Sequence, residues 1–197
     1  MKDKRSGKGE LCVFKGDPAQ LFSKYSGDWY RDLQEGEGRI EYKNGEMLSY
    51  TGSWKQGMQE GQGSMFYTNR DKYSGGWKKG VRSGQGTITY SSNNPREVSY
   101  NGEWSNGMPD GQGVGTSRSA TGNNIYTGQW EKGVRAGQGK CKYANGDVYE
   151  GEWSSDMRDG LGKCSFSSGE LYEGEWTRGI PPPPPLLIKS LHVRVTN

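Results

Sequence analysis

The chain has 197 residues, of which only 29% are hydrophobic and 33 are glycine, and its formal charge is +3. So few aliphatic side chains cannot fill the core of an ordinary two-layer domain, and so small a charge is not typical of a uniformly basic nucleic-acid-binding face. Aromatic residues nevertheless make up 12% of the chain and recur periodically, which argues against disorder and for a thin, ordered repeat structure.

Residues 1–24 are expected to form a basic N-terminus, a half-repeat and a loop. Residues 1–9 carry four basic side chains against one aspartate. The segment Gly7-Lys-Gly9-Glu-Leu11-Cys-Val13 matches the second half of later repeats, such as residues 36–42, so it is either an N-terminal cap or the edge of a longer array. The connection that follows contains Asp17-Pro18, a turn-forming pair.

Residues 25–179 contain seven copies of one frame, which opens with Tyr, Gly and Trp at alternate positions. All seven tryptophans of the chain occupy this frame, and its period of roughly 23–27 residues indicates a repeat architecture. Side chains at i, i+2 and i+4 share one face of a strand, so each opening predicts a β-strand with its rings on one side. The openings are Tyr25/Gly27/Trp29, Tyr50/Gly52/Trp54, Tyr73/Gly75/Trp77, Tyr100/Gly102/Trp104, Tyr126/Gly128/Trp130, Tyr149/Gly151/Trp153 and Tyr172/Gly174/Trp176.

Each opening strand is followed by a short turn and a returning strand that contains Gly-x-Gly. The third residue after each Trp is Gly or Asp, which predicts a left-handed turn position. The fourth is always apolar and is expected to tuck under the sheet. Two longer connections, 91–99 and 117–125, are expected to be surface loops. The apolar turn residues are Leu33, Met58, Val81, Met108, Val134, Met157 and Ile180.

Residues 180–197 break the pattern, since the seventh repeat is truncated after Gly179. Pro181–Pro185 predict a polyproline II linker that cannot continue a sheet. The segment 186–195 is the one mainly aliphatic stretch of the chain. Three structures suit it: a capping strand, a peptide that folds back on the array, or an element through which copies of the chain form a homo-oligomer.

The frame Tyr-x-Gly-x-Trp-x-x-Gly-x-x-x-Gly-x-Gly closely resembles the MORN (membrane occupation and recognition nexus) repeat, over residues 25–179 and the half-repeat at 7–13. The resemblance implies an all-β fold, an elongated single-layer antiparallel β-hairpin solenoid, roughly 65 Å long at about 4.8 Å per strand. In one respect the chain departs from the family. Where members often have His before the Gly-x-Gly pair, this chain has Glu35, Glu60, Ser83, Asp110, Ala136 or Asp159.

The sequence offers little catalytic chemistry, and we expect neither enzymatic activity, nor a cofactor, nor a metal site. The Gly-x-Gly pairs lack the following helix that a phosphate-binding loop requires. His192 is the single histidine, and no cluster of His and Cys has metal-ligand spacing. The carboxylates at the strand starts, Glu35, Glu60, Asp110 and Asp159, are expected to be solvated edge charges, about 10 Å or more apart.

The aromatic rings are expected to form the core of the sheet, because nothing else in the chain can supply that burial. A single layer cannot cover its own apolar face, so an open aromatic groove is predicted as the docking surface for an extended or helical protein segment. The candidate groove residues are Tyr73, Trp77, Tyr100, Trp104, Tyr126, Trp130, Met65 and Ile88.

The setting expected for the chain is cytoplasmic. The three cysteines have no disulfide spacing, and neither a signal peptide nor a membrane span is evident. The MORN resemblance implies a non-catalytic scaffold in a cytoskeletal or ciliary assembly. Two alternatives stay open, a membrane-proximal adaptor that binds anionic phospholipid through the basic N-terminus and a targeting segment of a larger enzyme. A nucleic-acid partner is not expected.

Overall fold

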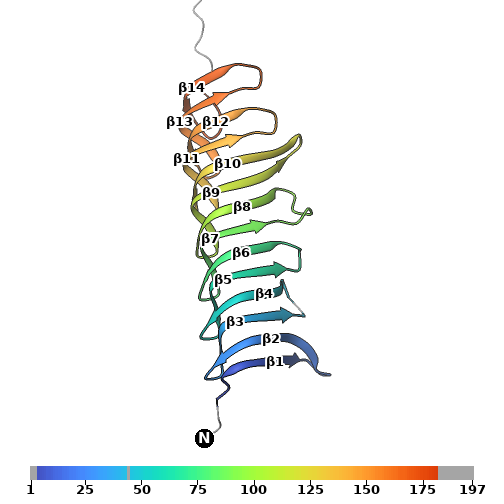
Figure 1. Cartoon of the computed structure of the whole chain (residues 1–197). Helices are drawn as coiled ribbons and strands as arrows, with labels where there is room; N and C mark the ends of the chain where they lie inside the picture. Colours follow the sequence, from blue (N-terminus) through green and yellow to red (C-terminus); the bar gives the residue numbers. More distant parts are fainter. Residues whose placement is uncertain (1–3, 44, 182–197) are drawn as a thin grey trace, which may run out of the picture.

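The computed structural model describes residues 4–43 and 45–181, which form one antiparallel sheet of fourteen strands stacked in chain order (Figure 1). The strands are β1 (Gly7–Lys15), β2 (Gln20–Tyr30), β3 (Leu33–Tyr42), β4 (Met47–Lys55), β5 (Met58–Tyr67), β6 (Lys72–Lys78), β7 (Val81–Thr89), β8 (Glu97–Ser105), β9 (Met108–Ser119), β10 (Gly122–Glu131), β11 (Val134–Lys142), β12 (Val148–Ser154), β13 (Met157–Ser165) and β14 (Leu171–Trp176).

The predicted single-layer hairpin solenoid is confirmed, with one difference in how the fourteen strands arise. The N-terminal half-repeat supplies β1, six complete hairpins supply β2–β13, and the truncated seventh repeat supplies only β14. Within a hairpin, the opening Tyr lies opposite the apolar residue of the returning strand, and Gly lies opposite Gly. The first complete hairpin pairs Tyr25 with Ile40 and Gly27 with Gly38.

The turns between opening and returning strands have the left-handed conformation predicted for them. In the third repeat Lys79 and Gly80 have φ of 50° and 80°, and the other six turns have two positive φ angles in the same places. Two successive left-handed residues are typical of a type I′ turn, whose twist matches that of the flanking strands. The position before Gly or Asp is therefore also left-handed, although here it is occupied by ordinary side chains.

Two of the predicted loops are instead strands. The connection before Tyr25 is a hairpin in which β1 extends to Lys15 and β2 starts at Gln20, and residues 117–125 lie largely in the β9–β10 hairpin. Both hairpins extend past the ring rows, where neither face of the strand packs on a core. The sequence there lacks the apolar alternation that predicts a strand, so the loop expected in both places is wrong. The loop around Asn94 is confirmed between Ser91 and Arg96.

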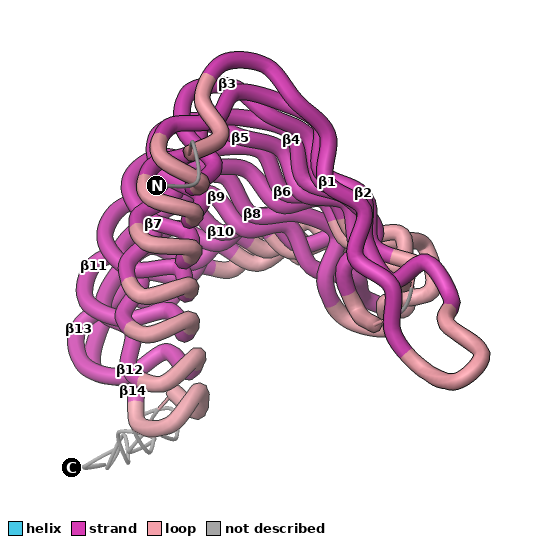
Figure 2. Tube along the Cα trace, turned by 90° about the horizontal axis from the view of Figure 1, so that it is seen from below, coloured by secondary structure: helices cyan, strands magenta, loops and turns pink. Residues whose placement is uncertain are grey.

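The sheet is sharply bent. A register shift, as at a β-bulge, lies between the Gly and the Trp of each of the six complete opening strands. Bulges bend a strand and increase its twist. Viewed along the stack, the strands form an angled trough with turns at one rim and longer loops at the other (Figure 2). One cavity is lined both by Tyr42 near the loop rim and by Gly80 at the turn rim, so the trough is concave on the side that carries the rings.

Several expectations concern residues that lie outside the described part of the chain. These are the polyproline linker beyond Pro181, the aliphatic segment 186–195 with its capping, docking and oligomer-forming alternatives, and Lys2 of the basic N-terminus. Within residues 4–43 and 45–181 there is no helix of the length and apolarity needed to cross a bilayer.

Candidate site on the concave face

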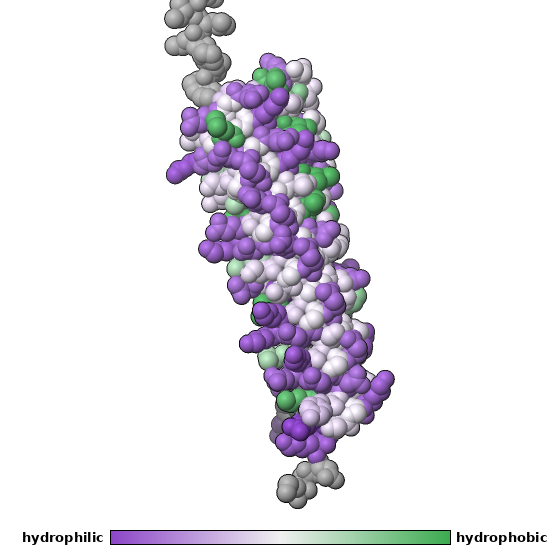
Figure 3. Space-filling view, turned by 60° about the vertical axis from the view of Figure 1, so that its left-hand side comes forward, coloured by the Kyte–Doolittle hydropathy of each residue, from purple (hydrophilic) through white to green (hydrophobic). Residues whose placement is uncertain are grey.

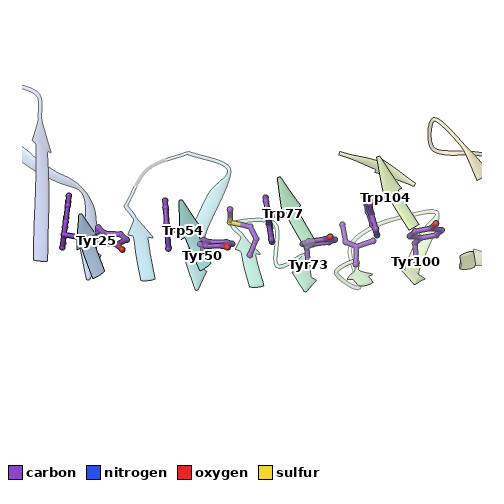
Figure 4. Close-up of a cluster of buried hydrophobic side chains, with 10 residues drawn as sticks. Tyr25, Tyr50, Trp54, Tyr73, Trp77, Tyr100 and Trp104 are labelled. Carbon is purple, nitrogen blue, oxygen red and sulfur yellow. The ribbon is translucent and has the colours of Figure 1, made fainter. Parts of the chain in front are cut away.

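The floor of the concave face is a ladder of alternating Tyr and Trp rings, and Figure 4 shows the part of it from Tyr25 to Trp104. Each Tyr from Tyr25 to Tyr149 contacts the Trp of its own repeat and the Trp of the next, always edge to face. The ring centroids are 5.0–5.4 Å apart with interplanar angles of 76–88°. Such pairs are worth about 0.5–1.5 kcal/mol beyond the area they bury. The ladder is therefore the core that joins one repeat to the next.

Every polar atom of the ladder has a backbone partner. In the fourth repeat, the Tyr100 hydroxyl donates to the carbonyl oxygen of Glu103 at 2.8 Å, and Trp104 Nε1 donates to that of Gly86 at 2.9 Å. The other rings repeat both bonds. Burial raises the pKa of Tyr73 and Tyr126 to about 12, because the phenolate cannot be solvated there.

Glycines make room for the rings. A Cβ added to Gly113 would overlap the Tyr100 ring, and the corresponding glycine of each complete hairpin lies equally close to its Tyr. The contact requires bare backbone on the returning strand. Glycine at this position is therefore a packing requirement.

Seven of the eight residues predicted to line the groove are buried. Tyr73, Trp77, Tyr100, Trp104, Tyr126, Met65 and Ile88 are 0–6% exposed, and only Trp130 is partly exposed. These side chains lie on the concave face but beneath its surface. The picture of a long, uncovered aromatic groove is thus corrected, because the bend of the sheet and the side chains described next cover most of the ladder.

The apolar residues after each turn were expected to tuck under the sheet, and this prediction is wrong. Six of the seven are 39–69% exposed, and Val134 is half-buried. The type I′ turn ends the strand pair beyond the bend, so these side chains project at the rim. On the face shown in Figure 3, hydrophobic side chains form separate spots on a mainly hydrophilic surface.

A row of arginines covers several of the tryptophans. The guanidinium carbons of Arg82, Arg135 and Arg158 lie 4.3, 4.4 and 4.0 Å from the ring centre of the next Trp along the array. Each also donates a 2.7 Å hydrogen bond to a carbonyl oxygen in the next turn. The guanidinium thus combines a cation–π contact with a bond across repeats. Arg5 makes the same pair of contacts, more loosely, with Trp29 and Asp32.

A second row of aromatic side chains lies two residues beyond the apolar position of each returning strand. It consists of half-buried rings along the trough, and burial raises the pKa of Tyr67 and Tyr90. In the fourth repeat this row is interrupted, because Ser117 occupies the ring position. The members of the row are Tyr42, Tyr67, Tyr90, Tyr143 and Phe166.

The fourth repeat lacks long side chains at three positions that cover the ladder in the fifth repeat. Pro109 stands at the position of Arg135, Gly115 at that of Cys141, and Ser117 at that of Tyr143. A cavity of about 350 Å³ opens there. Its lining includes Tyr90, Tyr100, Tyr126, Trp130 and Cys141. We call it the repeat-four cavity. It explains why Trp130 is the partly exposed ring among the predicted groove residues.

Charged groups line one side of the repeat-four cavity. Arg135 Nε lies 3.0 Å from the Asp156 carboxylate and so forms an ion pair across two turns. Glu97 is half-buried in the lining, and its pKa is raised, first by burial and then by the nearby Asp156. The cavity therefore joins an aromatic floor to a rim on which the charges are largely balanced, an arrangement suited to an apolar side chain with polar backbone beside it.

Comparison with protein families identifies the chain. A model of the MORN repeat matches seven segments, at residues 25–47, 50–72, 73–94, 100–119, 126–148, 149–170 and 172–181. The chain belongs to the MORN-repeat family. No curated protein sequence matches it. MORN-repeat proteins are generally non-catalytic repeat adaptors.

Three of the four acidic residues that stand before the Gly-x-Gly pairs of this MORN array have a structural role. Glu35 and Glu60 accept hydrogen bonds of 2.9 and 2.8 Å from the backbone N–H of Gln56 and Lys79, and Asp110 accepts a longer one from Lys132. The donor in each case is the first left-handed residue of the next turn. These carboxylates connect consecutive MORN repeats at their tips.

Sequence reasoning missed the arginine row and the repeat-four cavity in this MORN array. Both leave a signal at fixed repeat positions, since Arg82, Arg135 and Arg158 share one position. The cavity is visible only when Pro109, Gly115 and Ser117 are compared with the same positions of other repeats. The sequence alone does not indicate that these three positions face one space, because that depends on the bend of the sheet.

Proposed function

We propose that this MORN array is a non-catalytic adaptor that holds a segment of a partner protein along its concave face, with one anchor side chain in the repeat-four cavity. The observation that supports the proposal is the coincidence of three small or restricted residues in one repeat, Pro109, Gly115 and Ser117. A small or restricted residue at only one of these positions would leave a minor gap in the packing. Three together open about 350 Å³ above partly exposed Trp130, enough for a large side chain.

The lining of the cavity favours an apolar anchor such as Leu, Met or Phe. Tyr90, Tyr126, Trp130 and Cys141 supply apolar contact. Burying one such side chain contributes about 1.5–3 kcal/mol. Asn124 and the Arg135–Asp156 pair at the rim offer hydrogen bonds to the backbone on either side of the anchor.

Beyond the anchor, the segment would follow the second aromatic row. Equivalent rings recur every two strands, about 10 Å apart. An extended segment would then place a contact roughly every three residues, and a helical one about every seven. The half-buried rings nearest the cavity are Tyr90 on one side and Tyr143 on the other. Edge contacts of this kind would add specificity to the single anchor.

The proposal can be tested by mapping where a bound segment lies. Peptides that bind the 197-residue chain are first selected from a displayed random library. A photoreactive amino acid with a small aliphatic diazirine side chain, which leaves most of the cavity open, is then placed at Ser117 or, as a control, at Thr116. Ser117 lines the cavity, whereas the adjacent Thr116 points to the other face of β9. Cross-linking from position 117 alone is expected. Cross-linking from position 116 with none from 117 would overturn the proposal.

We further propose a cytoplasmic setting in a cytoskeletal or ciliary assembly, supported only by membership of the MORN family. Imaging of the tagged chain with markers of both structures tests it, and a uniform distribution would count against it. Flotation with anionic and neutral liposomes at two salt concentrations tests the phospholipid alternative. Salt-sensitive flotation with anionic vesicles, unaffected by changes at Ser117, would favour that alternative.

A further inference from the structure

The two outer strands of the sheet are complementary halves of one repeat. β1 is a returning strand, with Gly7, Gly9 and Leu11 on one face, and β14 is an opening strand, with Tyr172 and Trp176 on the same face. Across residues 4–43 and 45–181, each pairs with a neighbour on one side only. In six places within the array an opening strand is followed by a returning strand. Among the residues that the structure describes, the outer edges lack the partners that they offer each other, although Ile180 forms a bridge with Thr177 just beyond β14.

The ring packing at these edges is also complementary. In each complete hairpin the Tyr ring packs against a glycine of the returning strand. Tyr172 has no such glycine in the part of the chain that the structure describes, and its ring is half-exposed. Gly9 occupies the corresponding position on β1. A Cβ added there would meet only Trp29, on its inner side. Among the described residues, the Tyr172 ring thus has no glycine to pack on, and no Tyr ring packs on Gly9.

A polar group completes the match. In three hairpins the side chain before the Trp accepts a backbone N–H from the residue after the first glycine of the returning strand, as Glu103 does from Gln112 at 2.9 Å. The corresponding groups at the edges are the Glu175 carboxylate and the Lys8 N–H, whose side chains are also opposite in charge. Against this, the same register sets Glu173 opposite Glu10. Each of these already forms an ion pair, with Lys163 and Lys24 respectively.

We propose that copies of this chain associate head to tail, with β14 of one copy pairing antiparallel with β1 of the next. The register of the internal hairpins would set Tyr172 opposite Leu11 and Gly174 opposite Gly9, completing the repeat between two copies. Because β1 and β14 are different surfaces, the association is heterologous and forms open chains. The aliphatic segment 186–195, which lies outside the described residues, contains no glycine.

Cysteine cross-linking of the full 197-residue chain tests this register directly. The proposed pairing sets Leu171 opposite Cys12, a free cysteine that is exposed, and Leu171 itself is exposed. Directly opposed residues have Cβ atoms about 4.5–5.5 Å apart, close to disulfide distance. Under mild oxidation, Leu171→Cys should give a ladder of disulfide-linked species beyond dimers. The ladder should vanish when Cys12→Ser is added.

The matched control is Leu161→Cys, an equally exposed leucine on β13, which faces no cysteine in the proposed register. Sedimentation of the unmodified chain should show growth with concentration that Tyr172→Ala reduces severalfold, with the circular dichroism unchanged. A ladder no stronger for Leu171→Cys than for Leu161→Cys, or growth unaffected by Tyr172→Ala, would overturn the proposal. Neither outcome bears on peptide binding at Ser117.

Discussion

At the scale of single residues, glycine decides whether the rings can stack. Gly113 and Gly84 make the comparison, since both lie on returning strands but in different surroundings. A Cβ on Gly113 would overlap the Tyr100 ring, whereas a Cβ on Gly84 meets nothing within 4 Å, although φ there is +76°. An alanine at position 113 would therefore force the Tyr100 ring to move, whereas an alanine at position 84 would cause only backbone strain.

We expect Gly113→Ala to lower the free energy of unfolding by about 3 kcal/mol or more, in the range of severe overpacking. Gly84→Ala should cost about 1–2 kcal/mol, the cost of a left-handed alanine. Denaturant titration followed by tryptophan fluorescence measures both. Equal losses would mean that the ring contact with Gly113 contributes little.

The sequence predicts the residues of the ring ladder well, but it predicts the burial of the apolar side chains beside the ladder poorly. The alternation of Tyr, Gly and Trp is a local pattern that specifies a strand and its ring-bearing face, so the ladder could be predicted. Whether Met65 or Met108 reaches water depends on the bend at each bulge, which no period in the sequence records. Met65, which was expected to line an open groove, is buried, and Met108, which was expected to tuck under the sheet, is exposed.

At the scale of the element, each hairpin is joined to its neighbours by one Trp. Trp104 contacts Tyr73 and Tyr100 and is covered by Arg82, while Trp176 contacts Tyr149 and Tyr172. Both rings are buried. They differ in position, because Trp104 lies within the stack and Trp176 lies on its last strand.

Trp104→Ala should therefore cost about 3–5 kcal/mol and divide the array, since a large cavity opens between two halves. Trp176→Ala should cost clearly less, because a solenoid can lose its terminal strand while the other repeats stay stacked. Denaturant titration of the two variants tests the order of stacking. Equal losses would contradict it.

At the scale of the whole molecule, the buried tyrosines act together in their response to pH. Burial raises the pKa of Tyr25, Tyr73, Tyr126 and Tyr149 to about 12, and it also raises the pKa of Tyr50 and Tyr100. An unfolded Tyr titrates near 10. Between these values the unfolded chain has lost protons that the folded chain retains, so folded stability falls as pH rises.

The array should keep this stability below about pH 10 and lose it progressively towards pH 12. Thermal melts between these values, followed by circular dichroism, should show a falling midpoint. Tyrosinate absorbance should rise in the same transition, because the phenols ionise when the ladder opens. Titration of most tyrosines near pH 10 in a chain that stays folded would contradict the burial of the ladder.

Binding of a protein segment to the concave face at the fourth repeat can be tested by one affinity comparison. Ser117→Tyr fills the repeat-four cavity with the side chain that Tyr67, Tyr90 and Tyr143 place at the same position, so the fold should be preserved. Thr116→Tyr adds the same ring to the other face of β9. By calorimetry with a selected peptide, Ser117→Tyr should weaken binding about tenfold or more, or about 1.4 kcal/mol, and Thr116→Tyr should leave it unchanged. Unchanged affinity in a folded Ser117→Tyr variant would show that the segment does not use the cavity.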